Sequence, residues 1–233
     1  AYSPVDENWP GWLFYASTHF GPTNTWWEDF AALNDYIART QAFLQQGSPA
    51  NDILMYFPIY DAWHQSSVDF LRFSVHNYPD WFTGTPAHQT AQYLWNRGYT
   101  FDYISDRQLR DVSFTNNELT TGGAGYQTLL LPASEHMPIG TLREVIRLAD
   151  AGATVLVHQH LPNTVPGLGD LQQREGALHR LLDSLQFRPS EQTELSVAEV
   201  GNGSLVLGND LRQLLQVTSV AREPLADHNL EFI

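Results

Sequence analysis

Residues 51–64, NDILMYFPIYDAWH, contain the stretch that decides the fold, because Ile53 to Phe57 form a short apolar run typical of a buried strand. A helical pattern near Pro86 to Arg97 follows and leads into a second apolar run from Phe101 to Ile104. A strand, a helix and a strand in this order make a βαβ unit, whose two strands pair in parallel.

The same alternation continues toward the C-terminus. Tyr126 to Leu131 predict a third strand, and Leu142 to Ala149 carry an apolar stripe that predicts a helix ending at Gly152. Thr154 to Val157 predict a fourth strand. We therefore expect an α/β domain with a mainly parallel sheet between two layers of helices.

The sheet is expected to end in antiparallel pieces. Asp170 can cap one more helix, and Leu195 to Val200 with Leu205 to Leu207 predict a hairpin around Asn202-Gly203. We place the α/β domain at residues 49–208 and interpret residues 209–233 as a linker toward a following β domain.

Residues 1–48 have a different pattern. Leu13 to Ser17 are apolar enough for a buried strand, and a helix follows whose N-terminus fits a capping box formed by Thr25 and Glu28. One face of this helix is apolar, and Gly47 supplies its C-terminal stop; the residues of that face are Trp26, Phe30, Leu33, Ile37 and Leu44.

Composition excludes several classes of protein. The chain has no cysteine, which excludes disulfides, thiolate zinc sites and a cysteine nucleophile. Its formal net charge is −14 and every basic residue is arginine, which argues against nucleic acid as a partner. No apolar run reaches the roughly 18 residues that span a bilayer, so we expect no membrane partner.

Chemistry in an open α/β sheet collects beyond the carboxyl ends of the strands. Four such loops carry polar residues: 58–64, 105–106, 132–136 and 158–160. An active glutamine amidotransferase needs a cysteine on the sharp turn after a strand, and this chain has none. Ser134 lies in Ala133-Ser134-Glu135 and lacks the flanking glycines of a Gly-x-Ser-x-Gly elbow, which argues against a serine hydrolase.

His158 and His160 are two residues apart, so an extended strand would direct both imidazoles to one face, as some metal sites do. A metal-dependent hydrolase built on these histidines is one alternative function. Asp61, Asp106 or Glu135 could supply a third ligand only if their loops converge, and we expect no bound metal.

The aromatic N-terminal stretch suggests a carbohydrate site. Tyr2, Trp9 and Trp12 offer flat faces that stack on pyranose rings, and His19 offers a hydroxyl-binding group. Packing explains the same residues equally well. For Tyr60, Asp61, Trp63 and His64 we favour packing over sugar contact, and a non-catalytic carbohydrate-binding module is the other alternative function.

Several runs together resemble the family 106 glycoside hydrolases, the α-L-rhamnosidases. They span nearly the whole chain in that family's order: YSPVDENWPGWLFYASTHFGPTNTWW, DYIARTQAFLQQG, NDILMYFPIYDAWH, GYTFDYISD, YQTLLLPASEHMP, AGATVLVHQHLPNTVPGL and LEFI. The resemblance implies that residues 1–48 are the last βα unit of a (β/α)₈ catalytic barrel. It also implies that residues 49–208 form a three-layer, flavodoxin-like domain of the class I glutamine amidotransferase type that lacks the nucleophile.

The resemblance also implies a function. The parent enzyme would remove terminal α-L-rhamnose from plant or bacterial glycans and glycosides by an inverting mechanism, with a glutamate pair and a calcium ion in the barrel. We expect those catalytic residues upstream of Ala1, so Glu7 and Glu28 stay unassigned and the chain alone would be inactive, with no cofactor of its own. Its partners would be carbohydrate and the remaining parent domains, in the periplasm or outside a bacterial cell.

Overall fold

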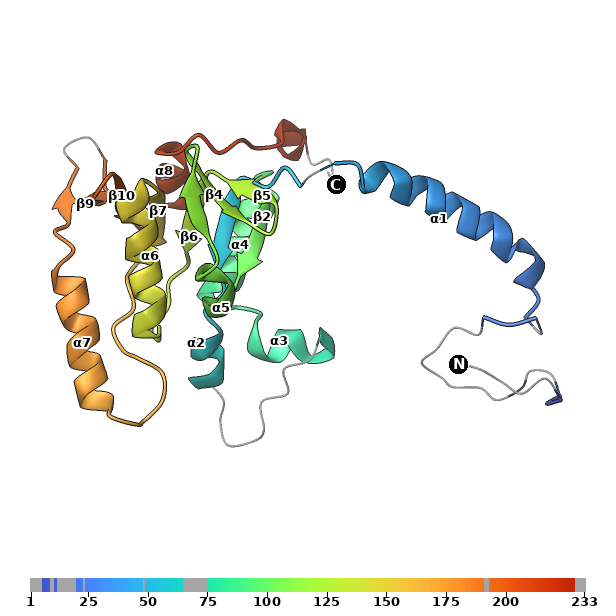
Figure 1. Ribbon diagram of the computed structural model, residues 1–233, viewed down its shortest axis with the longest axis horizontal. Coiled ribbons are helices and arrows are strands. Elements are labelled where there is room, and N and C mark those ends of the chain that lie inside the picture. The colour runs from blue at the N-terminus through green and yellow to red at the C-terminus, as the bar shows by residue number, and fades with distance from the viewer. Residues whose placement is uncertain are drawn as a thin grey trace. The chain divides into compact units, whose positions relative to one another are not determined.

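The structure is a computed structural model that describes residues 6–8, 11, 20–22, 24–47, 49–64, 75–190 and 193–228. The chain divides into two compact units, Ala1–Pro49 and Ala50–Ile233. Nearly all of the described secondary structure belongs to the second unit (Figure 1).

The first unit contains a 3₁₀ turn, Trp27–Asp29, that runs directly into α1, Phe30–Leu44. The predicted capping box is wrong, because Asp29 is the N-cap of α1 and makes no side-chain cap bond. The preceding 3₁₀ turn satisfies a backbone donor that a capping side chain would otherwise bind, because the Asp29 N–H donates to the Trp26 carbonyl at 3.1 Å. The predicted strand Leu13 to Ser17 lies outside the described residues.

A seven-stranded sheet forms the second unit, in the order β2-β1-β6-β7-β10-β9-β8. The first five strands in this order are parallel. β9 pairs with β10 in antiparallel orientation, and β8 pairs with β9 in antiparallel orientation. Their bounds are β1 Ile53–Tyr56, β2 Phe101–Ile104, β6 Thr128–Leu131, β7 Thr154–His158, β8 Arg188–Pro189, β9 Ser196–Val200 and β10 Gly203–Gly208. The predicted α/β class with a parallel sheet is confirmed, and so is the predicted hairpin, formed by β9 and β10.

Both faces of the sheet are covered, because its central strands are buried on both sides. In β1, Ile53 and Met55 point to a core shared with α4, Pro86–Asn96, and α8, Leu211–Gln216. Leu54 and Tyr56 point to the opposite core, which includes α6, Ile139–Ala151, and α7, Leu171–Asp183. This alternation explains why β1 reads as a continuous apolar run. The α8 leucines in the first core extend packing beyond residue 208 as far as Leu215.

Local sequence signals explain the start of α4 and the end of α6, but not the start of α7. The Thr85 hydroxyl accepts from the His88 N–H at 3.2 Å and begins α4 with Pro86 at its first position. Gly152 ends α6 as predicted, at a φ of 126° that favours glycine. Asp170 precedes α7 in a left-handed conformation with no side-chain cap bond, so its predicted capping role is wrong.

Short elements that the sequence did not predict connect the strands. They include a three-stranded antiparallel sheet, which splits the predicted strand 126–131 at Gln127. The bounds are α2 Ile59–His64, η2 Val75–Asn77, α3 Tyr78–Trp81, α5 Asp106–Leu109, β3 Ser113–Thr115, β4 Glu118–Thr121, β5 Ala124–Tyr126 and η3 Pro224–His228.

The segment after α8 returns to the amino ends of β1 and β2. The Ala221 N–H donates to the Asp52 carboxylate at 2.6 Å, and the Glu223 N–H donates to the Gly98 carbonyl at 2.7 Å. Gly98 has a φ of 80°, and a Cβ there would lie 2.3 Å from the Glu223 carbonyl oxygen. Glycine is therefore required at this crossing.

None of the helices within the described residues is long and apolar enough to cross a membrane.

Candidate functional site

The strand order reverses between β1 and β6. From β1 the chain moves outward to β2, then passes back over β1 to β6 and continues to β7 and β10. Loops at the carboxyl ends of two such strands diverge and leave a crevice between them, which is where open α/β sheets bind ligands. Here the two loops are α2, after β1, and residues 132–136, after β6.

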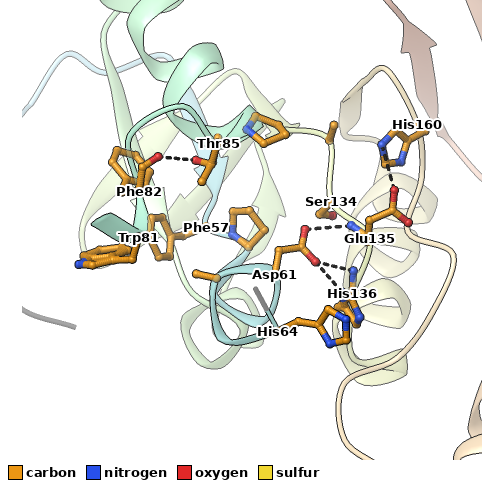
Figure 2. Close-up of a pocket in the computed structure, with 15 residues that line it drawn as sticks. Phe57, Asp61, His64, Trp81, Phe82, Thr85, Ser134, Glu135, His136 and His160 are labelled. Carbon is orange, nitrogen blue, oxygen red and sulfur yellow. Dashed lines mark hydrogen bonds and ion pairs between the residues drawn. The ribbon is translucent and has the colours of Figure 1, made fainter. Parts of the chain in front are cut away.

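Asp61 on α2 joins the two loops. Its carboxylate accepts hydrogen bonds from the Glu135 N–H at 2.9 Å and from the His136 N–H at 2.8 Å (Figure 2). The same carboxylate lies 2.8 Å from His136 Nδ1. Three nitrogen contacts at these distances occupy most of the accepting capacity of the carboxylate and fix the position of the 132–136 loop.

The Asp61 contact also determines the tautomer of His136. A carboxylate oxygen accepts hydrogen bonds, so Nδ1 of His136 is the ring nitrogen that carries a proton toward Asp61. The His64 ring lies against the His136 ring, with the ring centroids 4.1 Å apart and an interplanar angle of 34°. The stacking and the Asp61 contact together fix the orientation of the His136 ring.

A cavity of about 170 Å³ opens between the loops. One side is apolar and aromatic, and the other carries the polar groups of α2 and the 132–136 loop (Figure 2). The apolar lining comprises Phe57, Pro58, Ala62, Trp81, Phe82, Pro86, Ala87 and Ala133; the polar lining comprises Asp61, His64, Thr85, Ser134, Glu135, His136 and His160.

Ser134 is the unusual member of the lining. It is only 3% exposed, and its hydroxyl has no hydrogen-bond partner within the described part of the chain. Yet no side-chain nitrogen or oxygen atom among the described residues is fully buried without a partner. The exposed fraction of Ser134 therefore includes its hydroxyl oxygen, which faces the cavity.

Glu135 lies at the mouth of the cavity, with its side chain 52% exposed. Its carboxylate accepts from Asn163 Nδ2 at 2.7 Å and lies 3.7 Å from His160 Nε2. With Asp61 it places two carboxylates in the lining, and none of the described residues that line the cavity is an arginine. The cavity is therefore rich in acceptors and poor in fixed positive charge.

The prediction that His158 and His160 share one face is wrong. Between them Gln159 has a φ of 71°, so the alternation of an extended strand stops at His158. His158 is 7% exposed and hydrogen-bonded to Thr90 Oγ1 at 3.1 Å and to the Asn209 carbonyl at 3.3 Å. His160 lies at the surface beside Glu135. No three His, Asp or Glu side chains among the described residues are grouped to hold a metal ion.

Burial is the main cause of a lowered pKa for His158, opposed by its bond to the Asn209 carbonyl and by the nearby Asp210. The ring is therefore neutral at neutral pH. Because the carbonyl can only accept, Nε2 carries the proton and Thr90 donates to Nδ1. Both ring nitrogens are satisfied within the fold.

The geometry also argues against a serine nucleophile. Positive φ values at non-glycine residues in the described part of the chain occur at Asn116, Asn117, Gln159 and Asp170. Ser134 therefore lacks the strained turn of a nucleophile elbow.

Asp106 does not join the site. Its carboxylate accepts from the Tyr56 hydroxyl at 3.0 Å and from the Thr141 hydroxyl at 2.5 Å, which ties α5 to β1 and α6. Burial, and then Asp106, raise the pKa of Tyr56. This carboxylate is a structural anchor.

The predicted sugar-binding residues Tyr2, Trp9, Trp12 and His19 lie outside the described residues. Sequence reasoning named the loops of Asp61, Ser134, Glu135 and His136 but not their convergence, which depends on the strand order. It missed the aromatic side of the cavity: Trp81 and Phe82 follow α2 by almost twenty residues, and no local pattern links them to it.

Comparisons with known proteins place this chain in a family of glycoside hydrolases. The family profile described as alpha-L-rhamnosidase, glycoside hydrolase family 106, matches residues 1–233, so the chain belongs to this family. A Formosa agariphila protein with the provisional name β-glucuronidase is 29% identical over 201 residues, which cover 84% of this chain and 15% of that protein.

The solved rhamnosidase of Novosphingobium sp. PP1Y has a similar fold. It is 24% identical, with a TM-score of 0.58 over 89% of this chain and 17% of that one. The chain thus spans about a sixth of the length of either relative.

Proposed function

We propose that this chain is part of an inverting α-L-rhamnosidase that removes terminal α-L-rhamnose from plant or bacterial glycans and glycosides. The match of the family profile to all 233 residues carries this proposal. Residues 1–48 would be the last strand and helix of the catalytic barrel, and the α/β unit would be a glutamine-amidotransferase-like domain without catalysis. The enzyme would be periplasmic or secreted and bind carbohydrate and its own remaining domains.

Two observations support an amidotransferase-like domain. The parallel strands follow the order 2-1-3-4-5 when numbered along the chain, which is the flavodoxin-like order. The residue directly after β7, Gln159, has a left-handed φ of 71°, and its amide side chain is not a nucleophile.

The isolated chain should not hydrolyse rhamnosides. Glycoside hydrolysis needs two free carboxyl groups, one acting as acid and one as base or nucleophile. Asp61 and Glu135 are the carboxylates among the described lining residues, but the three nitrogen contacts of Asp61 hold it as a structural anchor. The calcium ion implied by the family does not fit the described residues, which offer no three-ligand group. We place the glutamate pair and the calcium upstream.

The test compares the full-length parent enzyme with the chain 1–233 on an aryl α-L-rhamnoside and an aryl β-D-glucuronide. We expect the parent to cleave the rhamnoside, with NMR showing the β-anomer of rhamnose as first product, and the chain to cleave neither. Cleavage of the glucuronide alone by the parent would refute the rhamnosidase assignment. Turnover by the chain that Asp61→Asn abolishes would refute its inactivity.

Trp9 and Trp12, with Tyr2 and His19, would help line the rhamnose pocket at the barrel strand ends. In the parent enzyme, Trp9→Ala or Trp12→Ala should then weaken rhamnoside binding by about 1–3 kcal/mol while folding survives. If the pair is structural, the same changes should cost about 3–5 kcal/mol of stability and leave affinity unaltered. Melting temperature and affinity, measured on both single mutants, distinguish the two roles.

A further inference from the structure

We propose that the cavity between β1 and β6 binds one neutral pyranose residue of a glycan, which makes the α/β unit a sugar-binding domain. The choice of rhamnose as the first ligand rests on the proposed function. The pocket itself rests on its lining, and all of its lining residues belong to the second unit.

Ser134 is the first observation that points to a ligand. Ser134 is 3% exposed, and the hydroxyl of so buried a residue normally has a hydrogen-bond partner in the fold, yet this one faces the cavity and has no partner among the described residues. Figure 2 shows Ser134 beside Asp61 and Glu135 on the polar side of the cavity. A ligand hydroxyl placed there can both donate to and accept from Ser134 Oγ.

Charge selects among ligands. A phosphate, sulfate or uronate would approach Asp61 and Glu135, and none of the described lining residues is an arginine that could balance its charge. A polyol instead presents O–H donors, which the exposed Glu135 carboxylate can receive. The polar side thus favours a neutral ligand with several hydroxyl groups.

The opposite side favours a flat ring. Phe57 lies near Trp81 and Phe82, with ring centroids 6.3 and 5.8 Å away, and together they form the aromatic side seen in Figure 2. The C–H face of a pyranose packs on such a surface. A volume of about 170 Å³ is close to the ~150 Å³ that accommodates a single benzene ring. The cavity therefore holds one ring, whose substituents would reach solvent.

A second, wider cleft of about 980 Å³ adjoins the cavity and shares His64 and His136 with it. Its lining includes Tyr60 and Trp63, and the Trp63 side chain is 51% exposed. A glycan that places its terminal sugar in the cavity can extend along this cleft. Methyl or aryl rhamnosides should therefore bind more tightly than free rhamnose.

The test measures binding of L-rhamnose, an aryl α-L-rhamnoside and D-glucuronate to the chain 1–233 by saturation-transfer NMR and calorimetry. We expect saturable binding of both rhamnose ligands and weaker or no binding of glucuronate. Ser134→Ala and Glu135→Gln should each weaken rhamnoside binding by about three- to tenfold. Glu118→Gln, on β4 outside the cavity, is the matched control and should leave binding unchanged.

Ser134→Leu fills the cavity and should abolish binding. Ser134→Ala should keep the wild-type melting temperature, because the Ser134 hydroxyl makes no hydrogen bond to the described residues, so a loss of binding in this variant is not a loss of structure. The proposal is overturned if no ligand saturates, if glucuronate binds best, or if both Ser134 variants bind like the wild type. Hydrolysis by the parent enzyme is measured separately, so failure of the pocket and failure of the rhamnosidase assignment are distinguishable.

Discussion

Two pairs of strand ends lie along the same edge of one parallel sheet, yet they use histidine in opposite ways. Beyond β7 and β10, His158 is buried and both of its ring nitrogens are bonded, to Thr90 and to the Asn209 carbonyl. Beyond β1 and β6, His136 is bonded to Asp61 through Nδ1 and lines a cavity. The strand order explains the difference, because loops diverge only where the order reverses.

The largest effect that tests this comparison is expected at the strand ends of β7 and β10, which we call the closed end. Thr90→Val keeps the shape of a fully buried side chain but leaves His158 Nδ1 without its donor. Stability should fall by about 1–3 kcal/mol, the cost of an unsatisfied buried polar atom. Urea denaturation measures the change, with Thr115→Val on the exposed edge of β3 as the control. A loss no greater than that of the control would show that His158 is not held as we describe.

A smaller effect is expected at the strand ends of β1 and β6, the open end that carries the cavity. Asp61→Asn replaces one accepting oxygen with an amide that faces donors, so at least one of three contacts is lost. Because the Asp61 side chain is 18% exposed, water compensates in part, and we expect a loss of about 1–2 kcal/mol. Rhamnoside binding should fall with it as the 132–136 loop shifts. Asp111→Asn, at an exposed position, is the control; an intact loop and unchanged binding in Asp61→Asn would contradict the anchoring role.

The smallest effect is a pH dependence of stability at the closed end. Burial lowers the pKa of His158, so between its ordinary value of 6.5 and the lowered one the unfolded chain binds more protons than the folded chain. The stability from neutral His158 is therefore complete above about pH 6.5 and declines as the pH falls through this window. Urea midpoints at a series of pH values should show a steeper decline in wild type than in His158→Gln. Equal slopes would remove His158 as the cause.

The sequence predicted the strands that are buried on both faces, because a short continuous apolar run is typical of such a strand. Ile53 to Tyr56 and Thr154 to Val157 are such runs, and both form strands. It missed the β3–β5 sheet, whose strands are three or four residues long and include three threonines. Such strands carry too few apolar positions to show a period.

The helix starts show a second limit of sequence reasoning. Thr25 and Asp170 are residue types that favour N-caps, but a 3₁₀ turn precedes α1 and a left-handed residue precedes α7. In both cases the backbone conformation just before the helix prevented the side chain from capping it. For the site, sequence reasoning identified the strand-end loops that carry Asp61 and Glu135, whereas their meeting point depends on the strand order. Trp81 lines the cavity because of the tertiary fold, which no local sequence pattern predicts.

The return of the chain to Asp52 and Gly98 after α8 has a consequence for circular permutation of the second unit. Asp52 lies near the start of this unit, and the segment that carries Ala221 and Glu223 is hydrogen-bonded to Asp52 and Gly98. A domain whose first and last segments are neighbours tolerates circular permutation. A short peptide that joins these two segments, with new ends opened in an exposed turn, should therefore leave the sheet and both of its cores intact.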